Sequence, residues 1–440
     1  IQTGTASIIP TITDDAIDSY TKQAIANSPY NDLKLDDLGP LPKPSAVPTA
    51  PGGPTPIEHV IYIVKENRTY DQVLGDIGKG ESEPSLALFD EKAGPNHHKL
   101  AREFVLLDNF YVNADVSADG HNWSTGAIAN DYVQKLWPNS YAKRRKHYDY
   151  EEQDPTSLPP AGYIWTAAAQ HGLSIRNYGY MVTNRATPGD DGVQVDSVRD
   201  PILSGATNMS YRGFDLDYPD VKRAQVFIKD LQQFEGTDSL PKLIVMRLGN
   251  DHTSGTAPGK IAPLSSFADN DYALGMIVNA VSRSKFWKTT AIFVLEDDAQ
   301  NGPDHIDSHR SPAFVISPYT HNASIDSTMY NTVSMLRTME LILGLRPMTQ
   351  FDAAARPMFN AFTNQPNAAG YDVESPRISL EERNPLEERK QAPNASAARS
   401  SHLDFSDADR ADDDELNDIL WRAIRHSTPP APVRSYFGGK

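Results

Sequence analysis

The 440-residue chain contains no cysteine, which excludes disulfides, thiolate metal ligands and a cysteine nucleophile. It also lacks any apolar run near the roughly 20 residues that a membrane-spanning helix needs, so no span is predicted. Basic residues are few: 41 Lys and Arg face 58 Asp and Glu, which gives a formal net charge of -17. This balance argues against a nucleic-acid groove and against docking on anionic membranes. An anionic substrate stays compatible, because a bound metal reverses the local field.

Pro-rich and polar stretches divide the chain into three parts. Residues 1–55 are expected to form an extended segment and a Pro-rich linker, with a short strand at 5–9. Residues 56–345 form the main domain, and polar insertions around 138–162 and 184–208 are expected to cap one edge of it. Residues 346–440 are expected to form a polar tail that packs on this domain and carries one amphipathic helix.

Apolar runs in the main domain alternate with segments of helical periodicity. Strands are expected at 60–64, 104–110, 173–178, 243–248, 291–295 and 313–316. Helices are expected at 14–26, 124–135, 166–170, 221–234, 268–286, 332–345 and 412–425. Strands that alternate with helices favour an α/β fold with a mainly parallel central sheet and helices on both faces.

Two of the expected strands end in side chains that can bind a cation. Glu66 and Asn67 follow the first strand, and Asp297 and Asp298 follow the fifth. Parallel strands present their carboxyl ends at one edge of the sheet, where ligands bind, and oxygen ligands from two strands suffice for a divalent metal. The alternative for the first pair is an ordinary turn. Adjacent carboxylates at a buried strand end repel each other unless a cation lies between them or one is protonated.

The sequence of segment 116–123 is typical of a tight turn that leads into a helix, and this segment contains Ser117 and His121. A Ser at such a turn lies near the N-terminal amides of the helix, which stabilise negative charge on its oxygen. A neighbouring metal would lower the pKa of the hydroxyl further. The alternative is that Ser117 only caps the helix. Beside two acidic strand ends, the nucleophile is the favoured interpretation.

Two histidine-bearing loops add candidates. Asp251 and His252 follow the fourth expected strand, and His305 and His309 lie in the loop after the acidic residues of the fifth. Side chains of this kind at strand ends could bind a second metal or hold a phosphate oxygen. The alternative for each is an ordinary hydrogen bond within a loop.

The run 57–71, which reads Ile-Glu-His-Val-Ile-Tyr-Ile-Val-Lys-Glu-Asn-Arg-Thr-Tyr-Asp, resembles the opening motif of the bacterial phosphoesterase family. The match continues through Ser-Ala-Asp-Gly-His at 117–121, Asp-Asp at 297–298 and Asp-His-Ile at 304–306, and covers about residues 56–345. The family includes phospholipases C and an acid phosphatase, and it belongs to the alkaline phosphatase superfamily. The resemblance implies an alkaline-phosphatase-like α/β catalytic domain. The Pro-rich lead-in looks closest to members with an N-terminal β-propeller, so such a domain is expected in full-length relatives.

The resemblance also implies roles for single residues. Glu66 and Asn67 match the metal ligands after the first strand, and Asp297 and Asp298 match the acidic pair. Ser117 matches the nucleophile position.

Other positions match less closely. His121 fits the register of a catalytic residue after the nucleophile, but Ala-Asp-Gly-His stands where the family usually has x-Pro-Asn-Arg, and Ser124 is therefore an alternative nucleophile. His252 is implied as a catalytic and substrate-binding residue. Asp251 and His309 are implied as ligands of a second ion, and His305 and the Asn67 amide are expected to contact substrate.

These observations predict a metal-dependent phosphoric-ester hydrolase that acts on a small phosphate ester through a phosphoseryl intermediate. One or two divalent ions are expected, with calcium, magnesium, manganese, zinc and iron all open. A phospholipase C-type phosphodiesterase and a non-catalytic metal-binding module are the alternatives. The lack of cysteine suits an exported bacterial protein, so a secreted or periplasmic location is expected.

Overall fold

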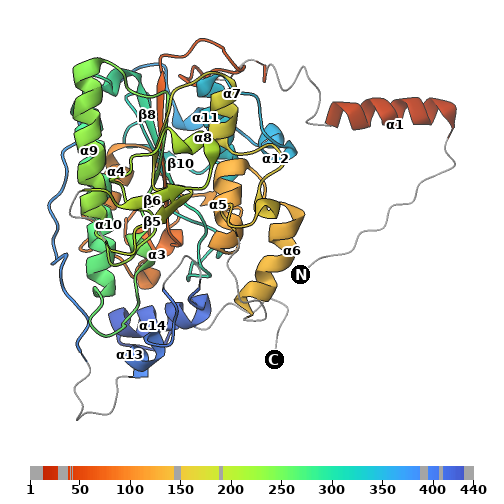
Figure 1. Cartoon of the computed structure of the whole chain (residues 1–440). Coiled ribbons are helices and arrows are strands. Elements are labelled where there is room, and N and C mark those ends of the chain that lie inside the picture. The colour runs from red at the N-terminus through yellow and green to blue at the C-terminus, as the bar shows by residue number, and fades with distance from the viewer. Residues whose placement is uncertain are drawn as a thin grey trace.

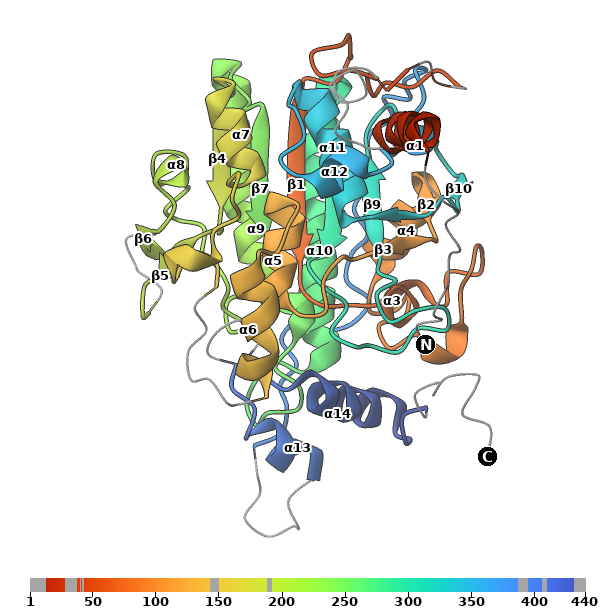
Figure 2. The ribbon, with the colours of Figure 1, turned by 90° about the vertical axis from the view of Figure 1, so that its right-hand side faces the viewer.

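Five strands form the central sheet (Figures 1 and 2), in the order β4 (Ile175–Tyr178), β7 (Leu243–Arg247), β1 (His59–Lys65), β8 (Thr290–Glu296) and β9 (Ala313–Ile316). The first four are parallel, and β9 pairs with β8 in the antiparallel direction. The predicted α/β class with a mainly parallel sheet is therefore confirmed. The computed structural model describes residues 13–27, 38–39, 41, 43–142, 150–187, 192–386, 395–405 and 410–430. The strand predicted at 5–9 lies outside this part of the chain.

Strand β1 is buried along its whole length because helices cover both faces of the sheet. Ile61 and Ile63 face a core that includes α9 (Asp220–Thr237) and α10 (Pro263–Arg283). Tyr62 faces the opposite core with α7 (Ile164–Gln170) and α11 (Thr332–Leu343), and the two views show these helix pairs on opposite sides of the strands (Figures 1 and 2). Side chains alternate between the faces along each strand, so a continuous apolar run is what a doubly covered strand requires.

The described residues form further elements around the central sheet. Helices are α1 (Asp14–Asn27), α3 (Tyr70–Leu74), α4 (Pro95–Glu103), α5 (Ser117–Gly126), α6 (Asp131–Tyr141), α8 (Pro201–Ser204), α12 (Gln350–Ala354), α13 (Ala395–Ser400) and α14 (Asp413–Arg425). Short strands are β2 (Leu106–Leu107), β3 (Phe110–Tyr111), β5 (Val182–Asn184), β6 (Val195–Val198), β10 (Ile325–Asp326) and β11 (Tyr330–Asn331). Turns of 3-10 helix are η1 (Pro84–Leu86), η2 (Pro155–Ser157), η3 (Asn250–His252), η4 (Trp287–Thr289) and η5 (Phe359–Ala361).

Two predicted elements differ from the structure. The strand predicted at 104–110 is instead the pair β2 and β3, which lie outside the central sheet and pair with β10 and β11. The helix predicted at 124–135 is split, because Ala127 adopts a left-handed conformation with φ of 56° and Asn130 caps a new helix by accepting from the Val133 amide at 3.0 Å. Apolar spacing continues across this break, so periodicity alone does not reveal it.

The 184–208 insertion contains regular structure where only loop was expected, since β5 and β6 form an antiparallel pair followed by α8. Helices α13 and α14 lie beyond the end of the sheet at which the parallel strands finish (Figure 1). Among the described helices, none combines the length and the apolar character needed to cross a bilayer.

Candidate active site

The register of the sheet brings the two predicted metal-binding pairs together. Lys65, at the end of β1, lies opposite Glu296, at the end of the neighbouring strand β8. The next residues, Glu66 and Asp297, therefore leave the sheet side by side, and both are fully buried. Asn67 follows in the left-handed conformation with φ of 67°, which Asn tolerates better than most residues.

Ser117 reaches the same place from α5, of which it is the first residue. Its Oγ donates to Asp298 Oδ2 at 2.8 Å and lies 3.1 Å from Asn67 Oδ1. The amides of the first helical turn carry the positive end of the helix dipole at this point. The structure therefore brings the predicted nucleophile together with residues from both predicted metal-binding pairs.

The orientation of the Asn67 side-chain amide bears on whether a metal ion fits here. The amide atom that faces the cluster lies 2.8 Å from Asp297 Oδ1, 3.1 Å from Ser117 Oγ and 3.3 Å from Asp298 Oδ2. With nitrogen at this position the amide donates to the carboxylates. With oxygen there, only oxygen atoms converge, and these repel each other unless a cation lies among them. Oxygen donors of this kind suit calcium, magnesium or manganese, so the residues fit a divalent ion.

Close packing of α5 against the end of β8 fixes this geometry. A Cβ atom on Gly120 would lie 2.9 Å from the backbone oxygen of Asp297, so only glycine allows the approach. Asp119 holds the start of the helix, because its Oδ1 accepts from the Val116 amide at 3.1 Å. Burial raises the pKa of Asp119 to about 7. The Asp-Gly pair that departs from the family motif thus has a structural role.

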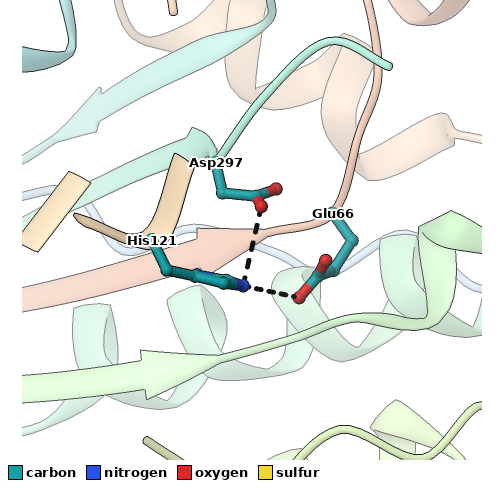
Figure 3. Close-up of side chains that lie close together, drawn as sticks. All are labelled: Glu66, His121 and Asp297. Carbon is teal, nitrogen blue, oxygen red and sulfur yellow. Dashed lines mark ion pairs between the residues drawn. The ribbon is translucent and has the colours of Figure 1, made fainter. Parts of the chain in front are cut away.

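His121 lies on the other side of Asp297 and points toward Glu66 (Figure 3). Its Nε2 is 3.6 Å from Glu66 Oε1 and 3.6 Å from Asp297 Oδ2, and the three side chains could surround a second ion. Arg247 competes for this position. Its Nε donates to Glu66 Oε1 at 2.6 Å, and its Nη2 donates to His121 Nε2 at 2.7 Å. The guanidinium therefore supplies the positive charge on this side of the site.

Burial, together with the charge of Arg247, lowers the pKa of His121 to about 3. His121 is therefore neutral at neutral pH, which does not suit a general acid there. Arg247 is held from the far side by Glu151, whose Oε1 accepts from Nη1 at 2.9 Å. Neither Arg247 nor Glu151 was predicted from the sequence. The signal available for Arg247 was its position as a basic residue at the end of a buried strand. Glu151 lies in the polar insertion around 138–162, where no motif or hydrophobic periodicity singles it out.

A buried ion triad supports the strand ends from the opposite face of the sheet. Lys65 Nζ lies 2.7 Å from Asp251 Oδ2 and 2.8 Å from Glu296 Oε1, and all three side chains are buried. Burial lowers the pKa of Lys65, but the two carboxylates outweigh burial and the net shift is upward. Burial raises the pKa of Glu296 well above its usual value. Asp251 is therefore engaged by Lys65 and is not brought to the cluster around Asn67.

Gln300, which was not predicted from the sequence, connects His252 to the site. The Gln300 amide donates to Asp298 Oδ1 at 2.6 Å, and its side-chain Nε2 lies 3.3 Å from His252 Nε2. His252 Nδ1 lies 2.9 Å from the Thr253 carbonyl and donates to it, which leaves Nε2 as an acceptor. Burial lowers the pKa of His252 to about 4.

The two other predicted histidines contact carboxylates other than Asp297 and Asp298. His305 Nδ1 lies 2.5 Å from Asp71 Oδ2, in a cluster with Asp304 that Arg310 also joins. His309 forms hydrogen bonds of 3.0 Å with Asp115 and with Asp307, and its side chain is 41% exposed.

Ser124, the alternative nucleophile, faces back along its own helix. Its Oγ donates to the His121 carbonyl at 3.3 Å, and its carbonyl accepts from the Tyr62 hydroxyl at 2.7 Å. Neither contact involves the acidic cluster. Of the two serines, Ser117 is the one that contacts the carboxylates.

A comparison with known protein families identifies the family of this chain. The model of the Phosphoesterase family matches residues 57–346. The chain belongs to the Phosphoesterase family. The matched range contains both acidic strand ends, α5 and the two histidine loops. Comparison with curated protein sequences finds no match for this phosphoesterase.

Solved structures similar to this phosphoesterase share little sequence with it. A protein in the alkaline phosphatase superfamily from Vibrio parahaemolyticus is 14% identical with a TM-score of 0.47, over 90% of this chain and 94% of that one. The lipoteichoic acid synthase LtaP from Listeria monocytogenes is 12% identical with a TM-score of 0.42, over 69% and 74%. A Bacteroides thetaiotaomicron protein from a glycosaminoglycan metabolism locus, BT33494S-sulf, is 13% identical with a TM-score of 0.44, over 66% and 73%.

Proposed function

We propose that this phosphoesterase is a metal-dependent hydrolase of phosphoric esters in which Ser117 is the nucleophile. The observation that carries the proposal is the 2.8 Å hydrogen bond from Ser117 Oγ to Asp298 Oδ2 at the N-terminal end of α5. A serine that begins a helix and donates to a buried carboxylate is placed to lose its proton and to have the resulting charge stabilised.

In the first step Ser117 Oγ forms a bond to phosphorus while the bond from phosphorus to the leaving-group oxygen breaks, and that oxygen takes a proton from water to leave as the alcohol. Asp298 Oδ2 accepts the hydroxyl proton, and the first-turn amides of α5 orient the phosphoryl oxygens. A water oxygen then forms a bond to phosphorus while the bond from phosphorus to Ser117 Oγ breaks; Oγ takes its proton back from Asp298, and phosphate is released. Glu66, Asn67, Asp297 and Asp298 would hold the divalent ion, which when bound would lower the pKa of the serine hydroxyl and screen the phosphate charge.

The histidines have more limited roles in this proposal. With a pKa of about 4, His252 is neutral at pH 7 and its Nε2 accepts hydrogen bonds, so it orients water or the departing alcohol and does not protonate it. His121 contributes a neutral ring whose Nε2 accepts from Arg247, and the Arg247 guanidinium positions both this ring and Glu66.

The test is Ser117→Ala, with Ser124→Ala as the matched control on the same helix. Ser117→Ala should lower turnover of p-nitrophenyl phosphate by at least ~1000-fold, while Ser124→Ala keeps most of it. Metal content, measured by mass spectrometry of the purified proteins, should be equal in the two variants. Retained turnover in Ser117→Ala would move the nucleophile elsewhere. Metal bound without turnover of any ester by the unmodified protein would favour the non-catalytic alternative.

A further inference from the structure

A cavity of about 540 Å³ lies beside the site, between the insertion that carries β5 and β6 and the segment after α13. Its walls include Arg185 and Arg212 from the insertion side, Lys260 from the loop before α10, and Leu403 and Phe405 from the C-terminal segment. Its volume is that of a pocket for a small organic molecule. The mechanism proposed above does not use this cavity.

The Phe214 ring separates the cavity from one side of the site. Phe214 lines the cavity, and its ring also lies 5.1 Å from the Arg247 guanidinium and 6.0 Å from the His252 ring. A Cβ on Gly249 would lie 3.1 Å from Glu66 Cγ and 3.3 Å from Phe214 Cδ2. One aromatic side chain therefore stands between the cavity and the residues around Glu66.

Phe405 closes the second side. Its ring lies 6.2 Å from the His252 ring, roughly perpendicular to it, while the same residue lines the cavity. Ser117, Asn67 and Asp298 are fully buried, so a substrate with a large alcohol part needs space beyond the phosphoryl site. Phe405 is a partly exposed wall of the cavity, whereas Leu416 of the following helix is fully buried in the main core.

The lining of the cavity limits what it can bind. Six of its 14 lining residues are charged, three of each sign. Two of the basic groups are paired with carboxylates of the same lining, Arg212 with Asp215 and Lys260 with Asp217. An acyl chain placed there would strip water from these charged groups without replacing its hydrogen bonds, which is costly. A polar organic group would supply hydrogen bonds, and the two phenylalanines offer it flat apolar faces.

We propose that this cavity is the subsite for the alcohol part of the substrate, and that Phe405 is the gate between it and His252. The inference rests on the proposed function and specifies its substrate class: phosphate esters of polar alcohols, in preference to phospholipids. The phosphoryl group lies at Ser117 and the alcohol extends past His252 into the cavity.

Binding tests the subsite without any turnover. In a Ser117→Ala background, Leu403→Trp fills the cavity, and Leu386→Trp is the control because Leu386 is 76% exposed and does not line it. By calorimetry, Leu403→Trp should weaken binding of adenosine monophosphate by about 10-fold or more, which is within the range for a changed pocket contact. Binding of inorganic phosphate should stay the same. Equal effects on both ligands, or no effect on the nucleotide in a variant with unchanged circular dichroism, would overturn the subsite.

Kinetics tests the gate. Phe405→Ala should raise kcat/KM for adenosine monophosphate by about 10-fold and leave p-nitrophenyl phosphate within about twofold, because only the larger alcohol needs the passage. Phe351→Ala, which removes a partly exposed phenylalanine outside the cavity, should change neither value. A larger gain for dihexanoylphosphatidylcholine than for the nucleotide would overturn the assignment to polar alcohols. Inactivity of the unmodified protein on every ester refutes the proposed function, while the binding test still decides the subsite.

Discussion

Lys65→Met should be among the most destabilising single substitutions in this protein. The ammonium lies 2.7 Å from Asp251 and 2.8 Å from Glu296, and the side chain of each partner is no more than 1% exposed. Methionine is close in size to lysine, so the change removes the charge with little change in packing. Two carboxylates then remain buried without their counter-charge. Removal of one partner from a buried ion pair costs about 3–5 kcal/mol of unfolding free energy.

The assay is urea denaturation followed by circular dichroism, with Lys135→Met as the control. Lys135 also pairs with a carboxylate, Asp131, but its side chain is 71% exposed, so its removal should cost less than ~1 kcal/mol. A loss below ~1 kcal/mol for Lys65→Met, with an unchanged denaturant slope, would refute the view that this triad holds the strand ends together.

The sign of the pH dependence gives a second check. The pKa of Glu296 is already raised in the presence of Lys65, and loss of the ammonium raises it further. A carboxyl group whose folded-state pKa is raised destabilises the fold as pH rises through that value. The deficit of Lys65→Met should therefore be smaller at about pH 5 than at about pH 8, and Glu296→Gln added to it should remove part of the deficit.

Two further outcomes follow from charges near the site. Arg247→Gln should allow an additional ion per chain to bind at Glu66 and His121, because the guanidinium no longer competes; an unchanged metal-to-protein ratio by mass spectrometry would contradict this competition. Hydrogen bonding to Asp115 raises the pKa of His309 to about 9, so its contribution to stability is present below about pH 6.5 and is lost as pH rises through about 9. Since His309 is 41% exposed, His309→Gln should cost under ~1 kcal/mol at about pH 6 in urea denaturation and nothing measurable at about pH 10.

The strands and the acidic residues at their ends could be predicted because both are local patterns. A strand covered on both faces must be apolar throughout, and the residue at which the run stops marks the sheet edge, as at Lys65 and Glu296, directly before Glu66 and Asp297. The contacts that complete the site are not local. Arg247 and Glu66 lie 181 positions apart, and no periodicity relates them.

The contacts of the loop histidines could not be predicted from the sequence either. A loop histidine near a strand end has several partners within reach, and the sequence does not rank them. His309 binds two carboxylates of its own surroundings, while His252 reaches the acidic pair through Gln300. The split between α5 and α6 was hidden for a related reason: a single left-handed residue, Ala127, leaves no trace in apolar spacing.

The close approach of Gly120 to the Asp297 backbone means that the helix that begins at Ser117 packs against the end of β8 with no room for a side chain between them. A tilt of α5 toward β8 would drive its main chain into the strand end, so this packing limits how far Ser117 can move relative to the carboxylates. Movement that admits a ligand is therefore expected in segments other than α5 and β8. Sequence changes in those segments can leave the alignment of Ser117 with Asp298 intact.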